Sequence, residues 1–532
     1  MSLLPVASIL PELLLALRQS PQVLLNAPTG AGKSTWLPLQ ILRDGAIEGR
    51  ILLLEPRRLA ARNVAQRLAE LLGEKPGETV GYRMRAETCV SSATRLEVVT
   101  EGILTRMIQH DPELSGVGLV ILDEFHERSL QADLALALLL DVQQGLRDDL
   151  KLLIMSATLD NDKLQLLLPQ APTIISQGRA FPVERRYQSL PPHQRFDEAV
   201  AIATAELLRT EPGSLLLFLP GVGEIQRVQN FLAERVADDV LLCPLYGALS
   251  LAEQRQAILP PPPGKRKVVL ATNIAETSLT IEGIRLVVDC AQERVARFDV
   301  RSGLTRLLTQ RISQASMTQR AGRAGRLEPG VCVHLPAKEQ AERATAQSDA
   351  EILQSDLSSL LLELLQWGCA DPTQLNWLDQ PPAANLAAAR RLLTQLAALA
   401  DGRLTTKGQK MASLGNDPRL AAMLVAAQSD DEVATAARLA AILEEPPRGA
   451  NHDLLQAFSR PQGQWQARSQ QLCKRLNRRA GQVDSDAIPA LLAQGFPDRI
   501  ARRRGQEGRS VSYTHLRAHE TCAALVCRLL LE

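Results

Sequence analysis

One segment near the start of the chain restricts the fold more than any other. An apolar run at residues 23–25 leads into APTGAGKS at 27–34. Glycines at 30 and 32 let backbone N–H groups approach phosphate oxygens, while Lys33 places a cation on the β- and γ-phosphates and Ser34 offers a hydroxyl to Mg²⁺. The helix expected after this loop presents its positive N-terminus to the same anion. The segment therefore predicts an α/β nucleotide-binding domain, although Ala27 stands where the general pattern has glycine.

Length and composition set the wider limits. A chain of 532 residues is too long for a single core, so three or four domains are expected. Its 60 basic and 59 acidic residues do not indicate a polyanion partner, but they allow a local basic groove. Eight cysteines without a CxxC pair favour reduced thiols and a cytoplasmic protein. Residues 1–15 lack a basic n-region and predict an amphipathic helix, and no uncharged run is long enough to span a bilayer.

The first half of the chain alternates strand-like and helix-like stretches. Short buried-strand runs are separated by helical patterns at 60–72 and 131–144, which is typical of βαβ units with a parallel sheet. The first runs lie at 51–54, 119–122 and 152–155, and the pattern restarts at 213–220, 267–271 and 285–289. Two α/β lobes are expected, with a boundary near 175–185.

The pattern changes twice in the second half. Residues 295–312 predict a long β-hairpin around a glycine turn at 301–303. Beyond about residue 345 the strand signals nearly disappear and amphipathic helices rich in leucine and alanine take over. A small helical or winged domain is expected to about 405, and a helical bundle to about 500.

Acidic and hydroxyl groups follow two of the predicted strands. In DEFHER at 123–128, Asp123 suits Mg²⁺ through water, and Glu124 suits the orientation or deprotonation of an attacking water. The alternative is an acidic helix N-cap. In SAT at 156–158, two hydroxyls can link the nucleotide site to an interlobe cleft, or simply cap a helix.

A basic motif lies nearly three hundred residues after the glycine loop. In QRAGRAGR at 319–326, Gln319, Arg323 and Arg326 recur on one helical face. A guanidinium placed there would stabilise charge that develops on the γ-phosphoryl group, as arginine fingers do. The alternative is a solvated basic face, against which the interleaved glycines and alanines argue. A polar loop at 271–278 also follows a predicted strand.

Together these motifs resemble those of the superfamily 2 DEAH-box helicases, over roughly residues 20–420. Further segments match the family's motifs in order: EPRR at 55–58 (Ia), TEGIL at 100–104 (Ib), LFLPG at 217–221 (IV), ATNIAETSLTI at 271–281 (V) and the basic motif at 319–326 (VI). Phe125 stands where the family name has alanine. With GRAFPVE at 178–184, it makes the chain most similar to the bacterial HrpB-type branch.

The resemblance implies an α/β fold of two tandem RecA-like P-loop domains, followed by a mainly helical winged-helix and ratchet-like bundle region. The expected domains are 1–178 (ATP-binding), 179–343 (helicase C-terminal, with the hairpin 295–312), 344–405 (winged-helix-like), 406–500 (helical bundle) and 501–532 (basic segment and tail).

The resemblance also implies a site for ATP and Mg²⁺ between the two lobes. The catalytic residues would be Lys33, Asp123 and Glu124 from the first lobe and Gln319, Arg323 and Arg326 from the second. The nucleotide would be bound by Ala27, Pro28, Thr29, Gly30, Ala31, Gly32, Lys33, Ser34, Thr35, Arg67, Asp123 and His126. Ser34 and Asp123 would hold Mg²⁺ through water.

Arg67 matches the arginine that stacks on the base, while Gln292 stands where the family has the partnering phenylalanine. That departure suggests a loose preference among nucleoside triphosphates, with Phe298 as a possible substitute.

A single-stranded nucleic acid is the implied partner, with RNA favoured over DNA. Arg57, Arg58, Thr100, Thr272 and Asn273 would contact its sugar-phosphate backbone, which carries no sequence information. The hairpin at 295–312 matches the family's strand-separating hairpin; an ordinary edge hairpin is the alternative.

The function expected from this resemblance is an ATP-dependent nucleic-acid helicase that couples hydrolysis to translocation along a single strand. The open alternatives are a nucleic-acid-stimulated NTPase that remodels without unwinding, and a nucleotide-gated scaffold. A cytoplasmic monomer is expected, with no membrane contact and no specific protein partner indicated.

The last part of the chain departs from the family pattern. A basic stretch at 499–509 is followed at 510–532 by sequence unlike the family's OB-like continuation. We interpret it as a truncated frame ending in a disordered or foreign tail, and expect ATP binding to survive but unwinding to be at risk. His515, His519, Cys522 and Cys527 do not follow a known zinc-finger spacing.

Overall fold

The computed structural model describes residues 4–512, except 86, 159–161, 179, 248, 278, 416, 447–453, 460–462, 480 and 505–508. The tail at 513–532, with its histidines and cysteines, lies outside the described residues, as do Arg179 and Ser278 of the expected motifs. The chain divides into two units. One holds both α/β lobes up to Glu351, and the other holds residues from Ile352 onward together with Arg106–His110 and Arg297–Arg306.

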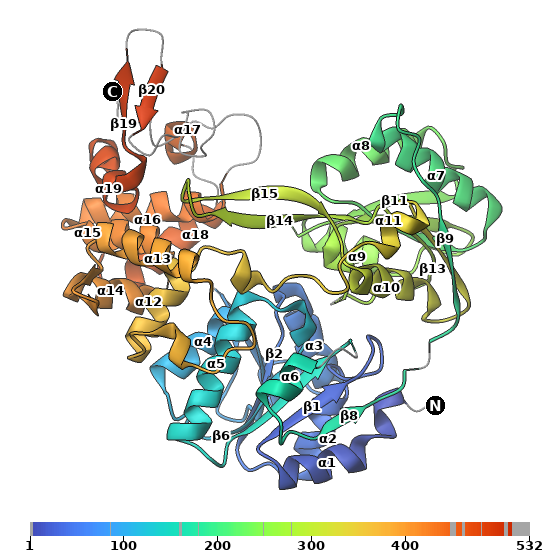
Figure 1. The fold of residues 1–532 in the computed structure, drawn as a ribbon, viewed down its shortest axis with the longest axis horizontal. Helices are drawn as coiled ribbons and strands as arrows, with labels where there is room; N and C mark the ends of the chain where they lie inside the picture. The colour runs from blue at the N-terminus through green and yellow to red at the C-terminus, as the bar shows by residue number, and fades with distance from the viewer. Residues whose placement is uncertain are drawn as a thin grey trace. The chain divides into compact units, whose positions relative to one another are not determined.

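The first lobe is built on an eight-stranded sheet of order β4-β3-β5-β2-β6-β7-β1-β8 (Figure 1). Its strands are β1 (Gln22–Asn26), β2 (Arg50–Leu54), β3 (Val80–Met84), β4 (Glu87–Cys89), β5 (Leu96–Val99), β6 (Val117–Leu122), β7 (Lys151–Ser156) and β8 (Thr173–Ile175). The β3–β4 pair is antiparallel and the other neighbours are parallel. The sheet confirms the predicted parallel α/β core. The prediction succeeded because strands that are buried on both faces have continuous apolar sequences.

Helix α1 (Leu10–Gln19) precedes the first strand, and further helices lie between the strands along the chain. These are α2 (Leu37–Asp44), α3 (Arg58–Glu70), α4 (Glu101–His110), α5 (Leu130–Gly145) and α6 (Asp162–Leu167). The side chain of Ser129 caps α5 by accepting a hydrogen bond from the Ala132 N–H group, which satisfies one of the free donors of the first turn. Helix α5 therefore begins directly after the acidic motif at 123–128.

The second lobe has a parallel six-stranded sheet of order β11-β12-β10-β13-β16-β9. Its strands are β9 (Val183–Tyr187), β10 (Ser214–Phe218), β11 (Val240–Leu245), β12 (Arg266–Ala271), β13 (Ile284–Asp289) and β16 (Gly330–His334). Its helices are α7 (Phe196–Thr210), α8 (Val222–Ala233), α9 (Leu251–Ile258), α10 (Gln314–Gly322) and α11 (Lys338–Glu342). The tandem α/β lobes expected from the sequence are thus present.

Strands β14 (Gln292–Asp299) and β15 (Leu304–Arg311) form the predicted hairpin, drawn in Figure 1 as a long two-stranded ribbon. Gly303 in its turn has φ +66°, a left-handed conformation that glycine adopts without steric cost.

The second unit is mainly helical. Its helices are α12 (Ser358–Trp367), α13 (Ala383–Gln395), α14 (Thr406–Leu414), α15 (Pro418–Ala426), α16 (Asp430–Glu444), α17 (Leu454–Ser459), α18 (Gly463–Arg475) and α19 (Ile488–Gly495). Two short hairpins pair β17 (Leu399–Ala400) with β18 (Arg403–Leu404), and β19 (Ala501–Arg504) with β20 (Arg509–Ser512). The helical C-terminal region agrees with the fold class expected from the sequence.

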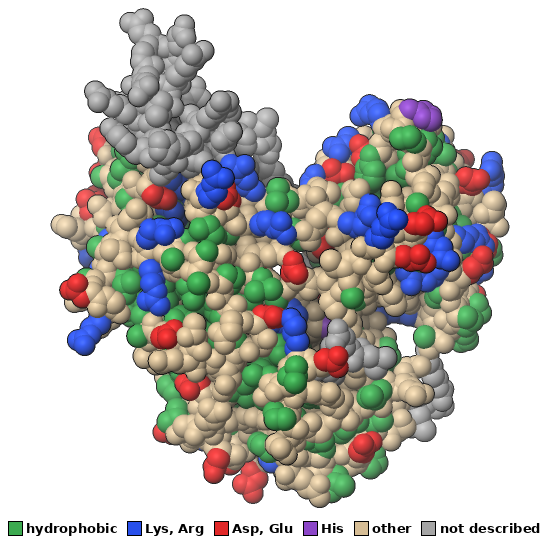
Figure 2. Space-filling model, in the orientation of Figure 1, with side chains coloured by type: hydrophobic (Ala, Val, Ile, Leu, Met, Phe, Trp, Pro, Cys, Tyr) green, Lys and Arg blue, Asp and Glu red, His purple; other side chains and the backbone are tan. Residues whose placement is uncertain are grey.

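Basic and acidic side chains are interspersed over the face drawn in Figure 2, in accord with a net charge of +1. In the part of the chain that the structure describes, no helix combines the length and apolar character needed to cross a bilayer.

Candidate nucleotide-binding site

The glycine loop connects β1 to α2. Gly30 and Gly32 have φ of +85° and +94°, so both need the conformational freedom of glycine. A Cβ on Gly32 would also lie 2.9 Å from Leu4 Cδ1, because the N-terminal segment packs under the loop. The Val6 N–H group donates to the Ala31 carbonyl oxygen across this contact. The N-terminal segment therefore helps to fix the shape of the loop.

The regular helix after the loop, α2, begins at Leu37 and not directly at Ser34. Pro38 is the reason, since it has no N–H group to donate to the Ser34 carbonyl and it restricts the residue before it. The N–H groups of Trp36 and Leu37 both donate to the Gly32 carbonyl oxygen. Residues 33–36 thus form hydrogen-bonded turns that separate the loop from the helix.

Four side chains meet at the end of β6. The Lys33 ammonium lies 3.1 Å from Glu124 Oε1 and 3.7 Å from Asp123 Oδ1. Ser34 Oγ donates a hydrogen bond to Asp123 Oδ2, and the Glu124 N–H group donates to Asp123 Oδ1 at 2.7 Å. Glu124 has φ +51°, and this left-handed turn directs its carboxylate to Lys33. Residues from the glycine loop and the acidic motif therefore form one cluster, as the sequence predicts for a nucleotide site.

Burial and charge give the two carboxylates different pKa values. Burial opposes ionisation of Glu124, but the Lys33 ammonium lowers the pKa of this carboxyl to about 2. Burial raises the pKa of Asp123 to about 6, and the more distant Lys33 opposes that rise. Although burial disfavours the ammonium, Glu124 and Asp123 raise the pKa of Lys33. Lys33 and Glu124 are therefore both charged at neutral pH.

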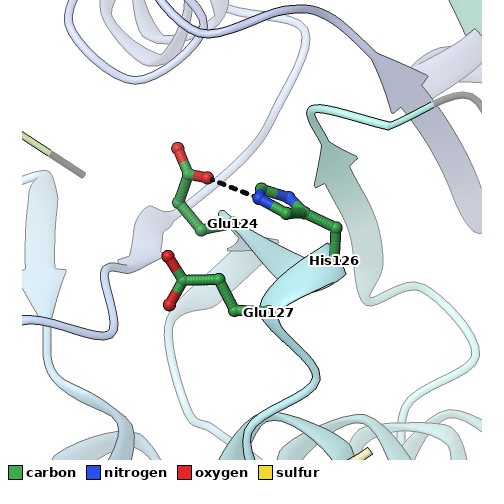
Figure 3. A group of neighbouring side chains, drawn as sticks. All are labelled: Glu124, His126 and Glu127. Atoms are coloured by element: carbon green, nitrogen blue, oxygen red, sulfur yellow. Dashed lines mark ion pairs between the residues drawn. The ribbon is translucent and has the colours of Figure 1, made fainter. Parts of the chain in front are cut away.

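His126 lies beside Glu124, and Figure 3 shows the two side chains with Glu127. The Ala157 N–H group donates to His126 Nδ1 at 3.1 Å, so the ring proton belongs on Nε2. Burial lowers the pKa of His126, which keeps the ring neutral at neutral pH. Nε2 lies 3.2 Å from Glu124 Oε2 without hydrogen-bond alignment. Because Nε2 carries the proton it cannot ligate a metal, although Glu124, His126 and Glu127 lie close enough together to suggest one.

Buried polar atoms without a hydrogen bond gather at this cluster. Among the described residues they include Lys33 Nζ, Glu55 Oε1, Glu124 Oε2, His126 Nε2 and Arg323 Nη2. Buried polar atoms without a hydrogen bond are rare in folded proteins, and here ion pairs offset only part of the hydration that Lys33 and Glu124 lose. Their concentration here is the property expected of a site built for a polar ligand.

Arg323 comes to this site from the second lobe. It follows α10 and is 3% exposed, and its guanidinium donates to the carbonyl oxygens of Glu276 and Leu279. Burial and the nearby Arg326 lower the pKa of Arg323, whereas the negative charge of Glu124 opposes this shift. Glu124 acts in the same direction on Arg326, whose guanidinium contacts Thr280 Oγ1 at 3.4 Å. Gln319 lies on α10 and is partly buried.

The sequence reasoning missed Arg320, the second residue of the basic motif. Arg320 is fully buried, and its guanidinium donates to Glu276 Oε2 and Asp289 Oδ1, each at 2.9 Å. His334 Nδ1 lies 2.9 Å from the other Asp289 oxygen, and Arg185 Nε donates to His334 Nε2. This network holds α10 on the second sheet. An arginine directly beside Gln319 was a visible signal, but the acids that pair with it are distant in sequence.

Replacing Arg320 with methionine is expected to lower the free energy of unfolding by about 3–5 kcal/mol, because Asp289 and Glu276 would be left buried and uncompensated. Urea unfolding followed by circular dichroism would show an earlier transition than in the wild-type chain. The matched control is Arg209→Met, at an exposed position of α7. Equal midpoints for both variants would contradict the assigned role of Arg320.

The residues predicted to contact nucleic acid have varied surroundings. Arg57 is engaged by protein groups: it donates to the Ile274 and Asn273 carbonyl oxygens at 2.9 and 3.4 Å. Arg58 is exposed and donates to the Arg85 carbonyl oxygen, whereas Thr100 is 8% exposed at the start of α4. Asn273 is exposed and Thr272 is partly buried in the loop after β12. Nucleic-acid contact by this set remains a prediction.

The residues predicted near the base are more open. Arg67 lies on α3 with its side chain 59% exposed, 3.6 Å from Glu70. The backbone carbonyl of Gln292 accepts a hydrogen bond from Arg320 at 3.3 Å. Phe298 lies in the part of the hairpin that belongs to the second unit. Base stacking by Arg67 remains a prediction.

Comparison with known proteins agrees with this geometry. A model of the DEAD/DEAH box helicases matches residues 7–167, and a model of the helicase conserved C-terminal domain matches residues 198–328. The chain is 78% identical over 509 residues to the ATP-dependent RNA helicase HrpB of Escherichia coli (strain K12), and 36% identical over 436 residues to the probable ATP-dependent RNA helicase DHR2 of Saccharomyces cerevisiae. These alignments cover 96% and 80% of this chain, which spans 63% and 59% of the two relatives.

Solved structures give the same result. The fold matches a crystal structure of the E. coli DExH-box NTPase HrpB with a TM-score of 0.90, and a crystal structure of the E. coli DEAH/RHA helicase HrpB with a TM-score of 0.93. Both are 77% identical in sequence; each match covers 97% of this chain, and 64% and 66% of the two solved chains. The motifs, the tandem lobes and these matches together show that the chain carries a DEAD/DEAH box helicase domain at residues 7–167 and a helicase conserved C-terminal domain at residues 198–328.

Proposed function

We propose that the chain is an ATP-dependent helicase that hydrolyses a Mg²⁺-bound nucleoside triphosphate while moving along single-stranded RNA. The observation that carries this proposal is the buried ion-paired cluster of Lys33, Asp123 and Glu124. Lys33 Nζ and Glu124 Oε2 in this cluster have no hydrogen bond, and the charge of Glu124 acts on Arg323 of the second lobe. The relatives named as ATP-dependent RNA helicases support ATP as the nucleotide and RNA as the partner.

In this proposal each charged group has one task. Lys33 neutralises the β- and γ-phosphates and keeps Glu124 ionised until the nucleotide binds. Glu124 orients the attacking water and accepts its proton, and the Nε2–H group of His126 offers a hydrogen bond beside it. Arg323 and Arg326 stabilise the charge that develops on the γ-phosphoryl group.

Ser34 and Asp123 are the residues that fit Mg²⁺. Their oxygens face one another in a hydrogen bond, and hydroxyl and carboxylate oxygens are the ligands this cation prefers. When bound, Mg²⁺ supplies positive charge to the phosphate oxygens. The surroundings of Asp123 support a cation site. Its carboxylate is 1% exposed and lies beside Ser34 Oγ and the Lys33 ammonium.

We also propose a cytoplasmic protein that acts as a monomer. The free cysteines among the described residues, four of the six buried, support a reducing compartment. The near-neutral net charge favours a local nucleic-acid path lined by Arg58, Thr272 and Asn273 over a broad basic face.

The acid limb of the pH profile offers a direct test of Asp123. Since its pKa is raised to about 6, the carboxyl gains a proton as the pH falls through that value and loses its ability to hold a cation. The kcat/KM for ATP at saturating Mg²⁺ is therefore expected to be level between about pH 7 and 8 and to fall below about pH 6. Circular dichroism at each pH checks that the fold persists. A profile that stays level to about pH 5 would contradict this assignment.

Strand displacement tests the proposed function itself. The full chain is incubated with a labelled RNA duplex that carries a single-stranded overhang, with ATP or without nucleotide. ATP-dependent release of the labelled strand is expected. Hydrolysis stimulated by RNA without strand release would favour the remodelling NTPase instead. If both hydrolysis and strand release were absent, the nucleotide-gated scaffold would be the better hypothesis.

A further inference from the structure

Glu127 has contacts that differ from those of the other acids in its motif. It is the last residue of the short 3₁₀ helix Phe125–Glu127, three residues after Glu124. Figure 3 shows the two carboxylates near each other, with only that of Glu124 paired to His126. Glu124 pairs with Lys33 of its own lobe, whereas Glu127 reaches the second lobe. Thr277 Oγ1 donates a hydrogen bond to Glu127 Oε1. A hydrogen bond to a charged acceptor is stronger than one between neutral groups.

Thr277 belongs to the segment that holds the arginine of the second lobe. Arg323 donates from Nε to the Glu276 carbonyl oxygen at 2.8 Å and from Nη1 to the Leu279 carbonyl oxygen. Thr277 lies between these two carbonyls and is 5% exposed. A single short segment therefore fixes Arg323 through its backbone and contacts the loop that carries Glu124 through one side chain.

Arg57 joins the same carboxylate from the first lobe. Its Nη2 atom lies 3.4 Å from Glu127 Oε1, and its Nη1 atom donates to the Ile274 carbonyl oxygen at 2.9 Å. The Glu127 side chain is 20% exposed and that of Arg57 27% exposed, so the pair is shielded more than a surface ion pair. Glu127 thus meets two residues, one from each lobe, at a single oxygen.

We infer that Glu127 and Thr277 are a positioning pair that sets Arg323 of the second lobe opposite Glu124 of the first. The inference rests on the proposed function, because it assigns the pair a role in nucleotide hydrolysis. Neither side chain needs to touch the nucleotide. Their hydrogen bond fixes the relation between the two groups that act on the γ-phosphate, and a small displacement of such groups costs about 10²-fold in rate.

A double-mutant cycle tests the pair in the full chain. Glu127→Met removes the acceptor, Thr277→Val removes the donor, and the third variant carries both changes. Each single variant is expected to lower kcat at saturating ATP and single-stranded RNA by about tenfold or more, with KM changed less than about threefold. If the residues act through one contact, the double variant should be no more than about threefold slower than the slower single variant.

Conservative variants distinguish positioning from a general loss of structure. Thr277→Ser and Glu127→Gln keep a donor and an acceptor, so both are expected to stay closer to the wild-type kcat than Thr277→Val and Glu127→Met. Glu12→Gln, at an exposed position of α1, is the matched control for the loss of an acidic group. Single effects that multiply in the double variant, or single variants with the wild-type kcat, would overturn the inference.

The same data separate this inference from the proposed function. If the wild-type chain hydrolyses ATP without any response to RNA, the helicase proposal fails while the cycle, measured on that basal hydrolysis, still decides the role of the pair. A wild-type chain without hydrolysis under any condition would overturn both.

Discussion

Replacing Glu124 with glutamine is expected to lower kcat for ATP by about 10²–10⁴-fold, the usual contribution of a general base. The substitution keeps the shape of the side chain but removes the charge that lies 3.1 Å from Lys33. The pKa of Glu124 is lowered to about 2, so the wild-type carboxylate is ionised at neutral pH and its oxygens can accept a hydrogen bond from the attacking water. A glutamine amide cannot accept the proton of that water, so hydrolysis is expected to stop after binding.

Two measurements separate the loss of chemistry from the loss of binding. Calorimetric titration should show ATP binding to the Glu124→Gln chain at an affinity near or above that of the wild type, because one negative charge beside the phosphates is gone. Glu12→Gln, exposed on α1, should keep the wild-type kcat. Hydrolysis at the wild-type rate in Glu124→Gln would remove Glu124 from the mechanism.

Lys33→Ala is expected to lower kcat/KM for ATP by at least about 10²–10³-fold, as loss of a charge-stabilising group typically does. Here the variant loses more than a phosphate contact. Lys33 is 3% exposed and is the partner of two buried carboxylates. Removing one partner of a buried ion pair costs about 3–5 kcal/mol, so the first lobe should also unfold at a lower urea concentration.

The two effects can be measured independently. ATP affinity and kcat/KM report the lost cation, and urea unfolding without nucleotide reports the uncompensated carboxylates. Lys75→Ala, an exposed lysine of the same lobe, should change neither quantity. Turnover at the wild-type rate in Lys33→Ala would contradict the assignment of the whole site.

The parallel sheets were predictable because their strands are buried on both faces. Residues 51–54, 119–122 and 152–155 were recognisable as apolar runs, and they lie within β2, β6 and β7. Strand β5 was not predicted. Its Glu97 is 1% exposed in the sheet, where Arg50 and Arg83 pair with it, and the charges interrupt the apolar pattern. A single sequence does not reveal that such charges compensate one another inside a fold.

The site was predictable to the extent that its motifs are local. Lys33, Asp123 and Glu124 follow β1 and β6, and the carboxyl ends of parallel strands lie at one edge of a sheet. The contacts that arrange the second lobe were not predictable. Arg320 with Asp289, and Glu127 with Thr277, join residues 31 and 150 positions apart, and only the folded chain brings them together.

ATP hydrolysis by the full 532-residue chain, with single-stranded RNA, single-stranded DNA or no nucleic acid, tests the central claim most directly. The account predicts hydrolysis that rises with RNA and that falls to background in the Glu124→Gln variant under all three conditions. Hydrolysis that is unaffected by RNA and equal in the wild-type and Glu124→Gln chains would contradict it.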